Sequence, residues 1–338
     1  MALDEATSTV PELHWDPIPL DAIRAAQDRL RGIALRTPLV RFDADDVAPA
    51  GSELFLKLEC LQPVRSFKLR GAYNAAAKLA EADPAALAEG VWTVSSGNMA
   101  QALAWSARVL DVPCTVYVPD SVPRVKLANI LRYGATPVEL PFAELVTLLQ
   151  ARHMEGARGQ FVSPFSDPDV MAGAGTMGLE LLEDLPEVDA VVAPWGGGGL
   201  ICGLASAIKA LRPRTKIYAS EVDTATPFAT SLAAGHPVTV PFTPSFVDGI
   251  GAPYTWPEMF EFAQGLVDGA IVVSREQTAA AARLVIERNR VIAEGAAATA
   301  IAAAMTGQAG TGRIACIVSG GNIDAKKLIT ILEGGTPA

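Results

Sequence analysis

The sequence predicts an α/β fold with two open, doubly wound parallel sheets, and three observations lead to that prediction. Short apolar strand segments alternate with helical segments from residue 91 to residue 152, which is the pattern of consecutive βαβ units. A similar alternation returns between residues 171 and 220. Half of the 338 residues are hydrophobic and 19% are charged, so the chain can bury the cores of two domains.

The first half of the chain begins with a polar arm, expected at residues 1 to 18, and a helix from residue 21 to residue 30. The helix is expected because Ile23, Ala26 and Leu30 share one face. Strands are expected at residues 54–58, 91–94, 114–118 and 136–140, and the helices that follow them at 68–83, 100–110, 124–133 and 143–152.

The second half is expected to contain strands at 189–194, 216–220 and 313–318 and helices at 171–185, 200–211, 274–290 and 296–305. Ser274 and Gln277 form a capping box at the start of one of these helices. A last helix is expected after Asn322, and the Pro- and Gly-rich segment 236–256 is expected to be irregular.

The composition of the chain argues against some classes of binding partner. The chain has 27 basic and 37 acidic residues, and its net charge of -10 argues against nucleic acid, which requires a basic face. No apolar run reaches the roughly 18 residues of a membrane span. The N-terminus lacks the basic and apolar regions of a signal peptide, so a cytoplasmic protein without a membrane partner is expected.

The cysteines and histidines show no pattern of a metal site. The four cysteines lie far apart and are mostly flanked by apolar residues, so we expect reduced side chains in the core. These residues are Cys60, Cys114, Cys202 and Cys316. The three histidines have no ligand spacing, and no metal ligand is predicted.

Four turns from a strand into a helix carry unusual chemistry, at residues 66–68, 95–98, 196–199 and 319–322. Ligands of open α/β sheets bind at the carboxyl ends of the strands, where such turns lie. Each turn brings polar side chains or bare backbone to that edge. We therefore expect the four turns to line one crevice.

Lys68 is the candidate nucleophile. Ser66 is expected to cap the following helix, which places Lys68 in the first turn, where the helix dipole lowers the pKa of an amine. An amine with a lowered pKa is nucleophilic near neutral pH. Taken alone, Lys68 would be interpreted as a solvated surface residue, and it is the other turns that favour a reactive amine.

A run of four glycines ends one buried strand and opens a helix. Bare N–H groups and the helix dipole form a cradle for a phosphate or carboxylate there, and a tight turn alone would need fewer glycines. The run consists of Gly196, Gly197, Gly198 and Gly199. The dinucleotide motif G-x-G-x-x-G fits poorly, because Ile201 and Cys202 occupy the place of its third glycine. Glu221 does lie where a ribose-binding acid would be found.

The other two turns offer polar groups to a substrate. Residues 95–98 bring two hydroxyls, an amide and N–H groups to a helix start, either as a carboxylate pocket or as a plain N-cap. Residues 319–322 supply one hydroxyl at a strand end, or simply a turn. A lysine amine, a phosphate cradle and a carboxylate pocket together fit pyridoxal 5'-phosphate and an amino-acid substrate.

These turns resemble the motifs of fold-type II pyridoxal-phosphate enzymes, whose fold is that of the tryptophan synthase β subunit, and in particular of threonine/serine dehydratases and serine racemases. The resemblance runs from about residue 21 to the C-terminus, with four motifs in the family's order and spacing. It implies a large domain of residues 1–84 and 164–338 and a small inserted domain of residues 85–163. It also implies that the cofactor lies between the domains and that the protein is a homodimer.

The resemblance also implies roles for individual residues. Lys68 bonds covalently to the cofactor and takes the Cα proton, and Phe67 packs beside the ring. The other cofactor contacts are Asn98 at the ring hydroxyl, Gly196 to Leu200 at the phosphate, Gly249 and Glu294 near the ring, and Ser319 at the pyridine nitrogen. The substrate side is lined by Ser95, Ser96, Gly97, Asn98, Met99 and Gln101. A neutral hydroxyl at the pyridine nitrogen favours elimination over transamination, because the ring is then a weaker electron sink.

Three positions depart from the family's pattern. Met99 replaces a histidine of many relatives beside the carboxylate pocket. Ser96 replaces an alanine that is common in dehydratases, and racemases use a serine there as their second acid/base. Pro227 lies six residues after Glu221, where cation-binding relatives have a second carboxylate, so we expect a weakened or absent metal site.

The sequence thus predicts a pyridoxal-phosphate lyase that acts by β-elimination on a β-hydroxy or other β-substituted amino acid, such as threonine or serine, and gives a 2-oxo acid and ammonia. An amino-acid racemase and a β-replacement synthase are the alternatives with the same cofactor. An NAD-dependent oxidoreductase and a non-catalytic metabolite-binding protein are alternatives of other classes, and the intact Lys68 argues against the latter.

Overall fold

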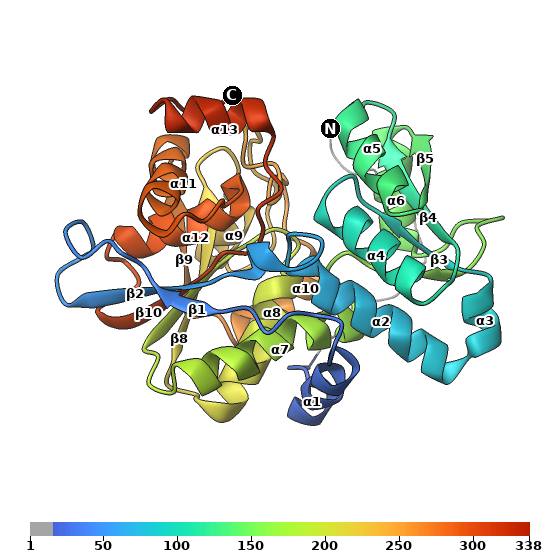
Figure 1. The fold of residues 1–338 in the computed structure, drawn as a ribbon, viewed down its shortest axis with the longest axis horizontal. Coiled ribbons are helices and arrows are strands. Elements are labelled where there is room, and N and C mark those ends of the chain that lie inside the picture. The colour runs from blue at the N-terminus through green and yellow to red at the C-terminus, as the bar shows by residue number, and fades with distance from the viewer. Residues whose placement is uncertain (1–15) are drawn as a thin grey trace.

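The computed structural model describes residues 16–338, which form two α/β domains side by side (Figure 1). The arm predicted for residues 1 to 18 lies almost wholly outside the described residues. None of the helices in residues 16–338 has the length and apolar character that crossing a membrane requires.

The large domain is organised around a six-stranded sheet with the order β1-β2-β10-β7-β8-β9. Neighbouring strands are parallel, except that β1 at the edge pairs antiparallel with β2. The strands are β1 (Leu39–Arg41), β2 (Ser52–Lys57), β7 (Ala190–Pro194), β8 (Lys216–Val222), β9 (Gly269–Val273) and β10 (Gly312–Ile317). The last strand of the chain therefore lies in the middle of the sheet, beside the second one.

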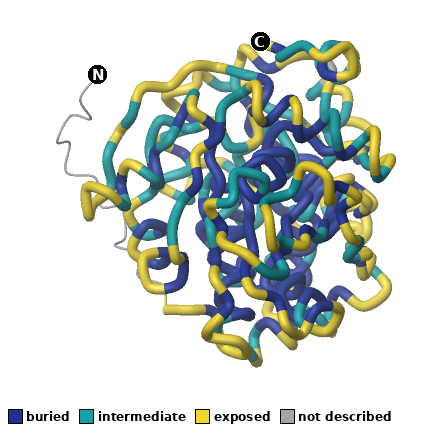
Figure 2. Tube along the Cα trace, turned by 90° about the vertical axis from the view of Figure 1, so that its left-hand side faces the viewer, coloured by how far each residue is buried: buried dark blue, intermediate teal, exposed yellow. Residues whose placement is uncertain are grey.

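Helices cover both faces of this sheet. Along β10, Ile314 and Cys316 face one apolar layer and Ala315 and Ile317 face the other, as the two-residue period of a strand requires. The first layer contains α11 (Arg275–Asn289), α12 (Gly295–Met305) and α13 (Ala325–Leu332), and the second contains α1 (Leu20–Arg29), α7 (Pro168–Asp184), α8 (Gly199–Leu211), α9 (Pro227–Ala234) and α10 (Pro257–Gln264). Burial on both faces explains why β7 is a continuous apolar run, and Figure 2 shows the buried residues gathered at the centre of the molecule.

The small domain is built on a four-stranded parallel sheet with the order β5-β4-β3-β6. Leu103 packs with Val116 on one face of this sheet, and Leu145 packs with Trp92 on the other. The strands are β3 (Val91–Val94), β4 (Cys114–Pro119), β5 (Thr136–Leu140) and β6 (Gln160–Phe161), and the helices are α3 (Pro84–Ala88), α4 (Asn98–Val109), α5 (Arg124–Arg132) and α6 (Phe142–Ala151).

The helix α2 (Lys68–Ala82) connects the two domains, because it packs against both α4 and α7. Its approach to α7 is close: a Cβ atom added at Gly71 would lie 2.7 Å from the carbonyl oxygen of Val170, and one added at Gly173 would overlap the backbone of Arg70. Glycine at both crossing positions is therefore a packing requirement. This packing fixes where Lys68 enters the space between the domains.

A buried cluster of charged side chains supports the start of α2. Arg70 donates hydrogen bonds to Glu180 and to Glu59 of the short 3-10 helix η1 (Glu59–Leu61), at 2.7 to 2.9 Å. Lys57 Nζ donates to Glu180 at 2.6 Å. Burial alone would raise the pKa of Glu59, and the charge and hydrogen bonds of Arg70 more than reverse this, so that pKa lies below its ordinary value. Two cations and two anions thus balance each other inside the large domain.

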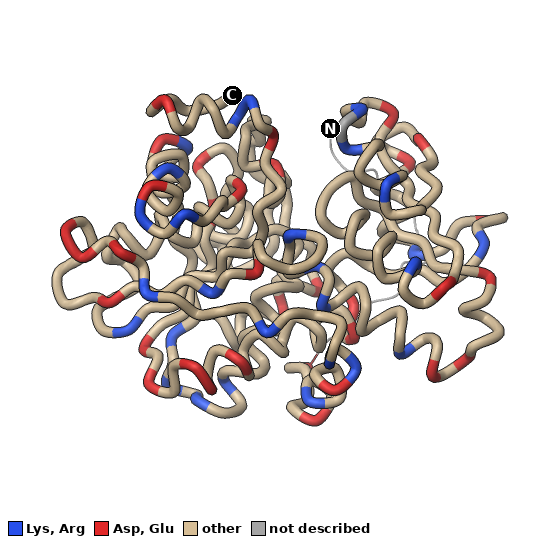
Figure 3. The backbone as a smooth tube through the Cα atoms, viewed as in Figure 1, with Lys and Arg blue, Asp and Glu red and all other residues tan. Residues whose placement is uncertain are grey.

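Charged residues otherwise lie mainly on the outside of both domains, with acidic and basic residues interspersed in the view of Figure 3. This distribution agrees with the acidic net charge of -10.

Candidate active site

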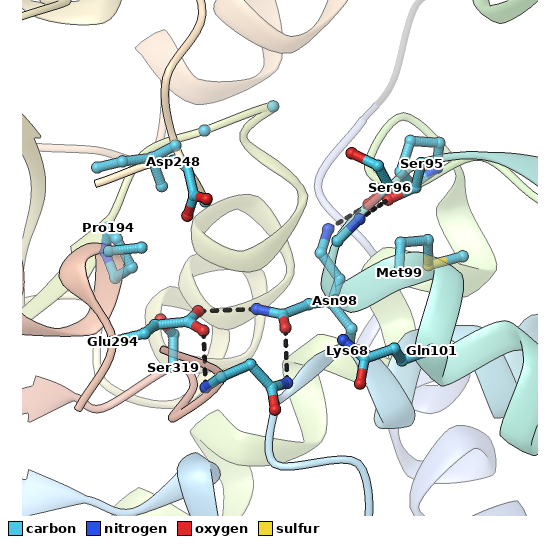
Figure 4. Close-up of a pocket in the computed structure, with 18 of the residues that line it drawn as sticks. Lys68, Ser95, Ser96, Asn98, Met99, Gln101, Pro194, Asp248, Glu294 and Ser319 are labelled. Carbon is cyan, nitrogen blue, oxygen red and sulfur yellow. Dashed lines mark hydrogen bonds between the residues drawn. The ribbon is translucent and has the colours of Figure 1, made fainter. Parts of the chain in front are cut away.

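The four turns predicted from the sequence meet in one cavity of about 600 Å³. Every residue predicted for the site lines this cavity, including Lys68 of α2, Ser96 in the turn before α4, Gly249 and Ser319. The lining comes from both domains, and Figure 4 shows side chains from the two sides pointing toward one another. The prediction that the turns share one crevice is therefore confirmed for the geometry of the chain.

Lys68 is the first residue of α2, as expected, although Phe67 rather than Ser66 occupies the N-cap position. The Ser66 hydroxyl accepts a hydrogen bond from the backbone N–H of Lys68 at 3.3 Å. The Lys68 amine donates to the carbonyl of Pro164 and lies 5.0 Å from the centre of the Phe67 ring. Burial lowers the pKa of this amine to about 8. The cause is loss of solvent around the amine, and the result is an amine that is partly neutral near physiological pH.

The glycine run follows β7 and opens α8 in the cavity wall. Within residues 16–338, the backbone N–H groups of residues 196–200 donate no hydrogen bond. Gly198 has a φ of +88°, which favours glycine, and a Cβ atom at Gly197 would overlap the Phe165 ring. Packing therefore requires part of the run, and the N–H groups that remain free at the start of α8 suit a phosphate.

Ser319 lies at the end of β10 and is 2% exposed. Its carbonyl accepts the backbone N–H of Phe67 at 2.9 Å, which ties the last turn to the lysine turn. Its hydroxyl lines the cavity and has no hydrogen-bond partner in the described part of the chain. A lysine amine, a free N–H cradle and an unpaired hydroxyl match the aldehyde, phosphate and ring nitrogen of pyridoxal phosphate, so the residues present fit this cofactor.

The small domain contributes the turn before α4. Ser95 Oγ accepts the backbone N–H of Gly97 at 3.2 Å, and the Ser96 hydroxyl faces the cavity without a partner among residues 16–338. Met99 reaches the cavity wall but is only 2% exposed, because it packs into the core of the small domain. In Figure 4 its side chain points away from Asn98. Gln101 is also buried at the cavity wall.

Glu294 joins the two sides of the cavity. Its Oε1 accepts a hydrogen bond from Asn98 Nδ2 at 2.7 Å, and its Oε2 accepts the backbone N–H of Asn322 at 3.0 Å. Asn322 Nδ2 in turn donates to Asn98 Oδ1 at 2.8 Å (Figure 4). Burial, with a contribution from Asp248, raises the pKa of Glu294 to about 7.

Charged residues that were not predicted for the site also line the cavity. Asp248 forms ion pairs with Lys126 of α5, at 3.1 Å, and with Lys327 of α13, at 3.9 Å. Asp248 had a signal in the sequence, since it precedes Gly249. Lys126 and Lys327 had none, because each lies on a helix with an ordinary amphipathic pattern.

Glu221 lies outside the cavity. Its carboxylate accepts the backbone N–H groups of Phe228 and Ala229 at the start of α9, at 2.9 and 2.8 Å, and burial raises its pKa to about 7. Glu221 therefore caps a helix, with Pro227 as the first residue of that helix. Residues 16–338 contain no group of three or more His, Cys, Asp and Glu side chains arranged to hold a metal ion.

The fold and the site define a class: an α/β protein with a cavity between two domains, lined by a lysine amine, free backbone N–H groups and unpaired hydroxyls, which suits a phosphorylated aldehyde. The chain belongs to the family of pyridoxal-phosphate dependent enzymes, whose model matches residues 30–320. Pyridoxal phosphate is accordingly its cofactor.

Similar proteins include lyases and racemases. An L-threonine ammonia-lyase of Geobacter sulfurreducens is 39% identical over 326 residues, which are 95% of this chain and 80% of that protein. A serine racemase of Oryza sativa subsp. indica is 36% identical over 327 residues, with 93% of each chain covered. The solved structure of maize serine racemase superposes with a TM-score of 0.85 at 33% identity, and covers 94% of this chain and 97% of its own.

Proposed function

We propose that this enzyme is an ammonia-lyase that acts by β-elimination on threonine, serine or a similar β-substituted amino acid, from which the β-substituent leaves, as water in the case of threonine and serine, and that gives a 2-oxo acid and ammonia. The observation that carries the proposal is the position of the Lys68 amine, which reaches the cavity between an N–H cradle and the turn at residues 95–98. The L-threonine ammonia-lyases of Geobacter sulfurreducens and Thermotoga maritima, at 39% and 36% identity, support this choice.

The residues of the chain divide the reaction between them. The hydroxyls of Ser95 and Ser96 and the backbone N–H of Ser96 would hold the substrate carboxylate, and residues 196–200 would hold the cofactor phosphate. Bound pyridoxal phosphate supplies the electron sink that acidifies the Cα–H bond of the amino acid. The neutral Lys68 amine accepts the Cα proton, with a pKa of about 8 that suits a base near neutral pH.

Water is the only other reactant that the remaining steps require. Hydroxide leaves Cβ with the electron pair of the C–O bond and takes up a proton, so that one water molecule is formed. The released enamine takes up a proton at Cβ, and water then replaces its nitrogen to give the 2-oxo acid and ammonia. Ser319 offers the ring nitrogen a neutral partner, which supports elimination over amino transfer.

Racemisation is the second candidate, and one observation favours it. The Ser96 hydroxyl faces the cavity without a hydrogen-bond partner in residues 16–338, so it is free to move a proton at Cα. The serine racemase of rice at 36% identity agrees with this reading. Lys68 would then keep the proton that it removes from Cα, and Ser96 would donate its own hydroxyl proton to Cα on the other face of the substrate.

The test uses the purified holoenzyme with L-threonine, L-serine and their D-isomers. We expect 2-oxo acid and ammonia in equal amounts, with a change in the visible absorption of the bound cofactor when substrate is added. Absorption changes without ammonia would overturn the lyase proposal, and appearance of the opposite isomer would replace it with racemisation. In that case Ser96→Ala should abolish isomer exchange and retain elimination.

We also propose that the enzyme is a cytoplasmic homodimer and that residues 85–163 form the small domain. One chain has a mass of 35.3 kDa, and sedimentation equilibrium should give twice this mass. A measured mass equal to that of one chain would exclude the dimer. Mild proteolysis should cut first near residues 84 and 164, where the chain passes between the two sheets.

A further inference from the structure

The carboxylate of Glu294 is the point where three segments far apart in the sequence meet. Its two oxygens accept hydrogen bonds from the side chain of Asn98 and the backbone of Asn322, and its own N–H donates to the carbonyl of Gly320 at 3.0 Å. Asn98 begins α4 of the small domain, whereas the other residues belong to the large domain. Glu294 thus forms a buried contact between the domains at the wall of the cavity (Figure 4).

The orientation of both asparagine amides follows from their neighbours. The Val64 carbonyl can only accept, so the Asn322 Nδ2 atom must face it, at 3.0 Å. The second hydrogen of that nitrogen points to Asn98, which therefore turns Oδ1 toward Asn322 and Nδ2 toward Glu294. The backbone N–H of Asn322 can only donate, so Glu294 must accept from both partners. The network has one consistent arrangement, and the ionised carboxylate of Glu294 suits it best, because both oxygens accept a hydrogen bond.

Space for this carboxylate is provided by glycine. A Cβ atom at Gly320 would lie 2.5 Å from Glu294 Oε1, and one at Gly249 would lie 3.7 Å from it. The glycine that follows Ser319 is therefore needed to admit the side chain of Glu294. Glu294 is 8% exposed, and burying a carboxylate is unfavourable unless its hydrogen bonds are complete.

The charged groups that face Glu294 come from several elements. Asp248 of the segment before Gly249 raises its pKa and Lys126 of α5 lowers it, while burial has the largest effect. Cys60 of η1 is also close enough for the Glu294 charge to raise the pKa of its thiol. A protonated Glu294 has one acceptor fewer, so the contact with Asn98 or Asn322 must weaken when the carboxyl takes up a proton.

We propose that Glu294 is a positioning residue: its carboxylate fixes the Asn98 amide at the cavity wall and locks the small domain onto the large one. Glu294 then acts on the reaction through Asn98 rather than by touching the substrate. The proposal does not depend on whether the reaction is elimination or racemisation, because the contact exists in the protein without substrate.

The first variant is Glu294→Gln, which keeps the shape and removes one acceptor. Its amide nitrogen must face either the N–H of Asn322 or the Nδ2 of Asn98, so that one donor meets another. We expect faster hydrogen exchange in the first turn of α4, by about tenfold or more, and a decrease of kcat/KM of similar size. In the wild type, exchange in α4 should slow as the pH rises through about 7 and Glu294 ionises, and this dependence should be lost in the variant.

The second variant, Asn98→Asp with Glu294→Gln, restores the network with donor and acceptor exchanged. The two oxygens of the new carboxylate can accept from Gln Nε2 and from Asn322 Nδ2. We expect α4 exchange to return to within about twofold of the wild type, whereas kcat/KM stays low, because the cavity wall now presents a carboxylate in place of an amide. This double variant also keeps the test open if Glu294→Gln alone does not fold.

Glu221→Gln is the matched control, since Glu221 is a buried carboxyl with a similarly raised pKa outside the cavity. It should lower thermal stability without changing α4 exchange or kcat. Wild-type exchange of α4 in Glu294→Gln, or no recovery of exchange in the double variant, would overturn the proposal. Because exchange is measured without substrate, a wrong substrate assignment cannot produce either result.

Discussion

The Nζ atom of Lys68 donates a hydrogen bond to the backbone carbonyl of Pro164, which lies 96 residues later in the chain. Lys68 begins the helix that connects the domains, and Pro164 follows β6, the last strand of the small-domain sheet along the chain. The amine is therefore held at the junction of the two domains. Its neighbours supply a carbonyl and the Phe67 ring, and burial lowers its pKa to about 8.

The lowered pKa of Lys68 predicts a distinct reactivity in the cofactor-free protein. The rate of acetylation at Lys68, followed by mass spectrometry, should rise with pH around a midpoint of about 8, compared with 10.5 for an ordinary lysine. Lys216, an exposed lysine of β8 whose hydrogen bond with Asp268 raises its pKa above the ordinary value, is the control and should show the higher midpoint. A shared midpoint for the two residues would contradict the prediction.

The same shift predicts how stability depends on pH. Between pH 8 and 10.5, the unfolded chain holds the Lys68 proton more tightly than the folded chain does. The free energy of unfolding should therefore increase with pH across this window. Lys68→Met should remove this increase, and urea titrations at several pH values would measure the free energy of unfolding of both proteins. The variant should also fail to retain the cofactor after dialysis.

Removal of Arg70 should be strongly destabilising. Arg70→Met leaves the buried carboxylates of Glu59 and Glu180 with only part of their partners, since both accept hydrogen bonds from Arg70 in the folded chain. Breaking a buried charge cluster of this kind costs about 3–5 kcal/mol. Urea denaturation would measure this loss of unfolding free energy. The control is Arg288→Met, which removes an exposed ion pair with Asp46. An equal loss in both variants would show that burial of the cluster is not decisive.

The glycine run should tolerate substitution according to the space at each position. Gly197→Ala is expected to displace the Phe165 ring and to weaken cofactor binding by tenfold or more, because about 1.4 kcal/mol of strain already gives that factor. Gly265→Ala, where nothing lies within 4 Å of an added Cβ atom, should leave cofactor binding unchanged. Titration of the cofactor-free variants with pyridoxal phosphate, followed by absorption, would compare them.

Local patterns in the sequence were enough to predict the residues of the four turns that line the cavity, because each turn has its own composition. Contacts between distant residues had no such signal. Glu294 and Asn98 are 196 positions apart, and Lys126 and Asp248 are 122 positions apart, so only the packed fold brings each pair together. The cause of the lowered Lys68 pKa was missed for the same reason, since burial depends on the whole structure.

Most strands and helices of the fold were predicted, and those that were missed are β1, β6, β9, α3, α9 and α10. α9 and α10 begin with Pro227 and Pro257, which fit the first turn of a helix although prolines within a sequence usually mark breaks. β6 has two residues, too few for a clear period, whereas β9 has five, as many as the predicted β5 and β7, so its length does not explain why it was missed. The irregular character of residues 236–256 was predicted and is confirmed, as the structure has no helix or strand there.

The buried cysteines predict the behaviour of the protein at alkaline pH. Burial raises the pKa of Cys60, Cys114 and Cys316 to about 12, and that of Cys202 further. The unfolded chain therefore loses thiol protons at lower pH than the folded chain, and this contribution to stability should fall as pH rises above about 9. The contribution of the cysteines therefore opposes that of Lys68 at alkaline pH.

Burial of the four cysteines also predicts how they react. A thiol reagent should label none of them in the folded protein at pH 8 and all four in urea, and rapid labelling of the folded protein would show that these side chains are accessible.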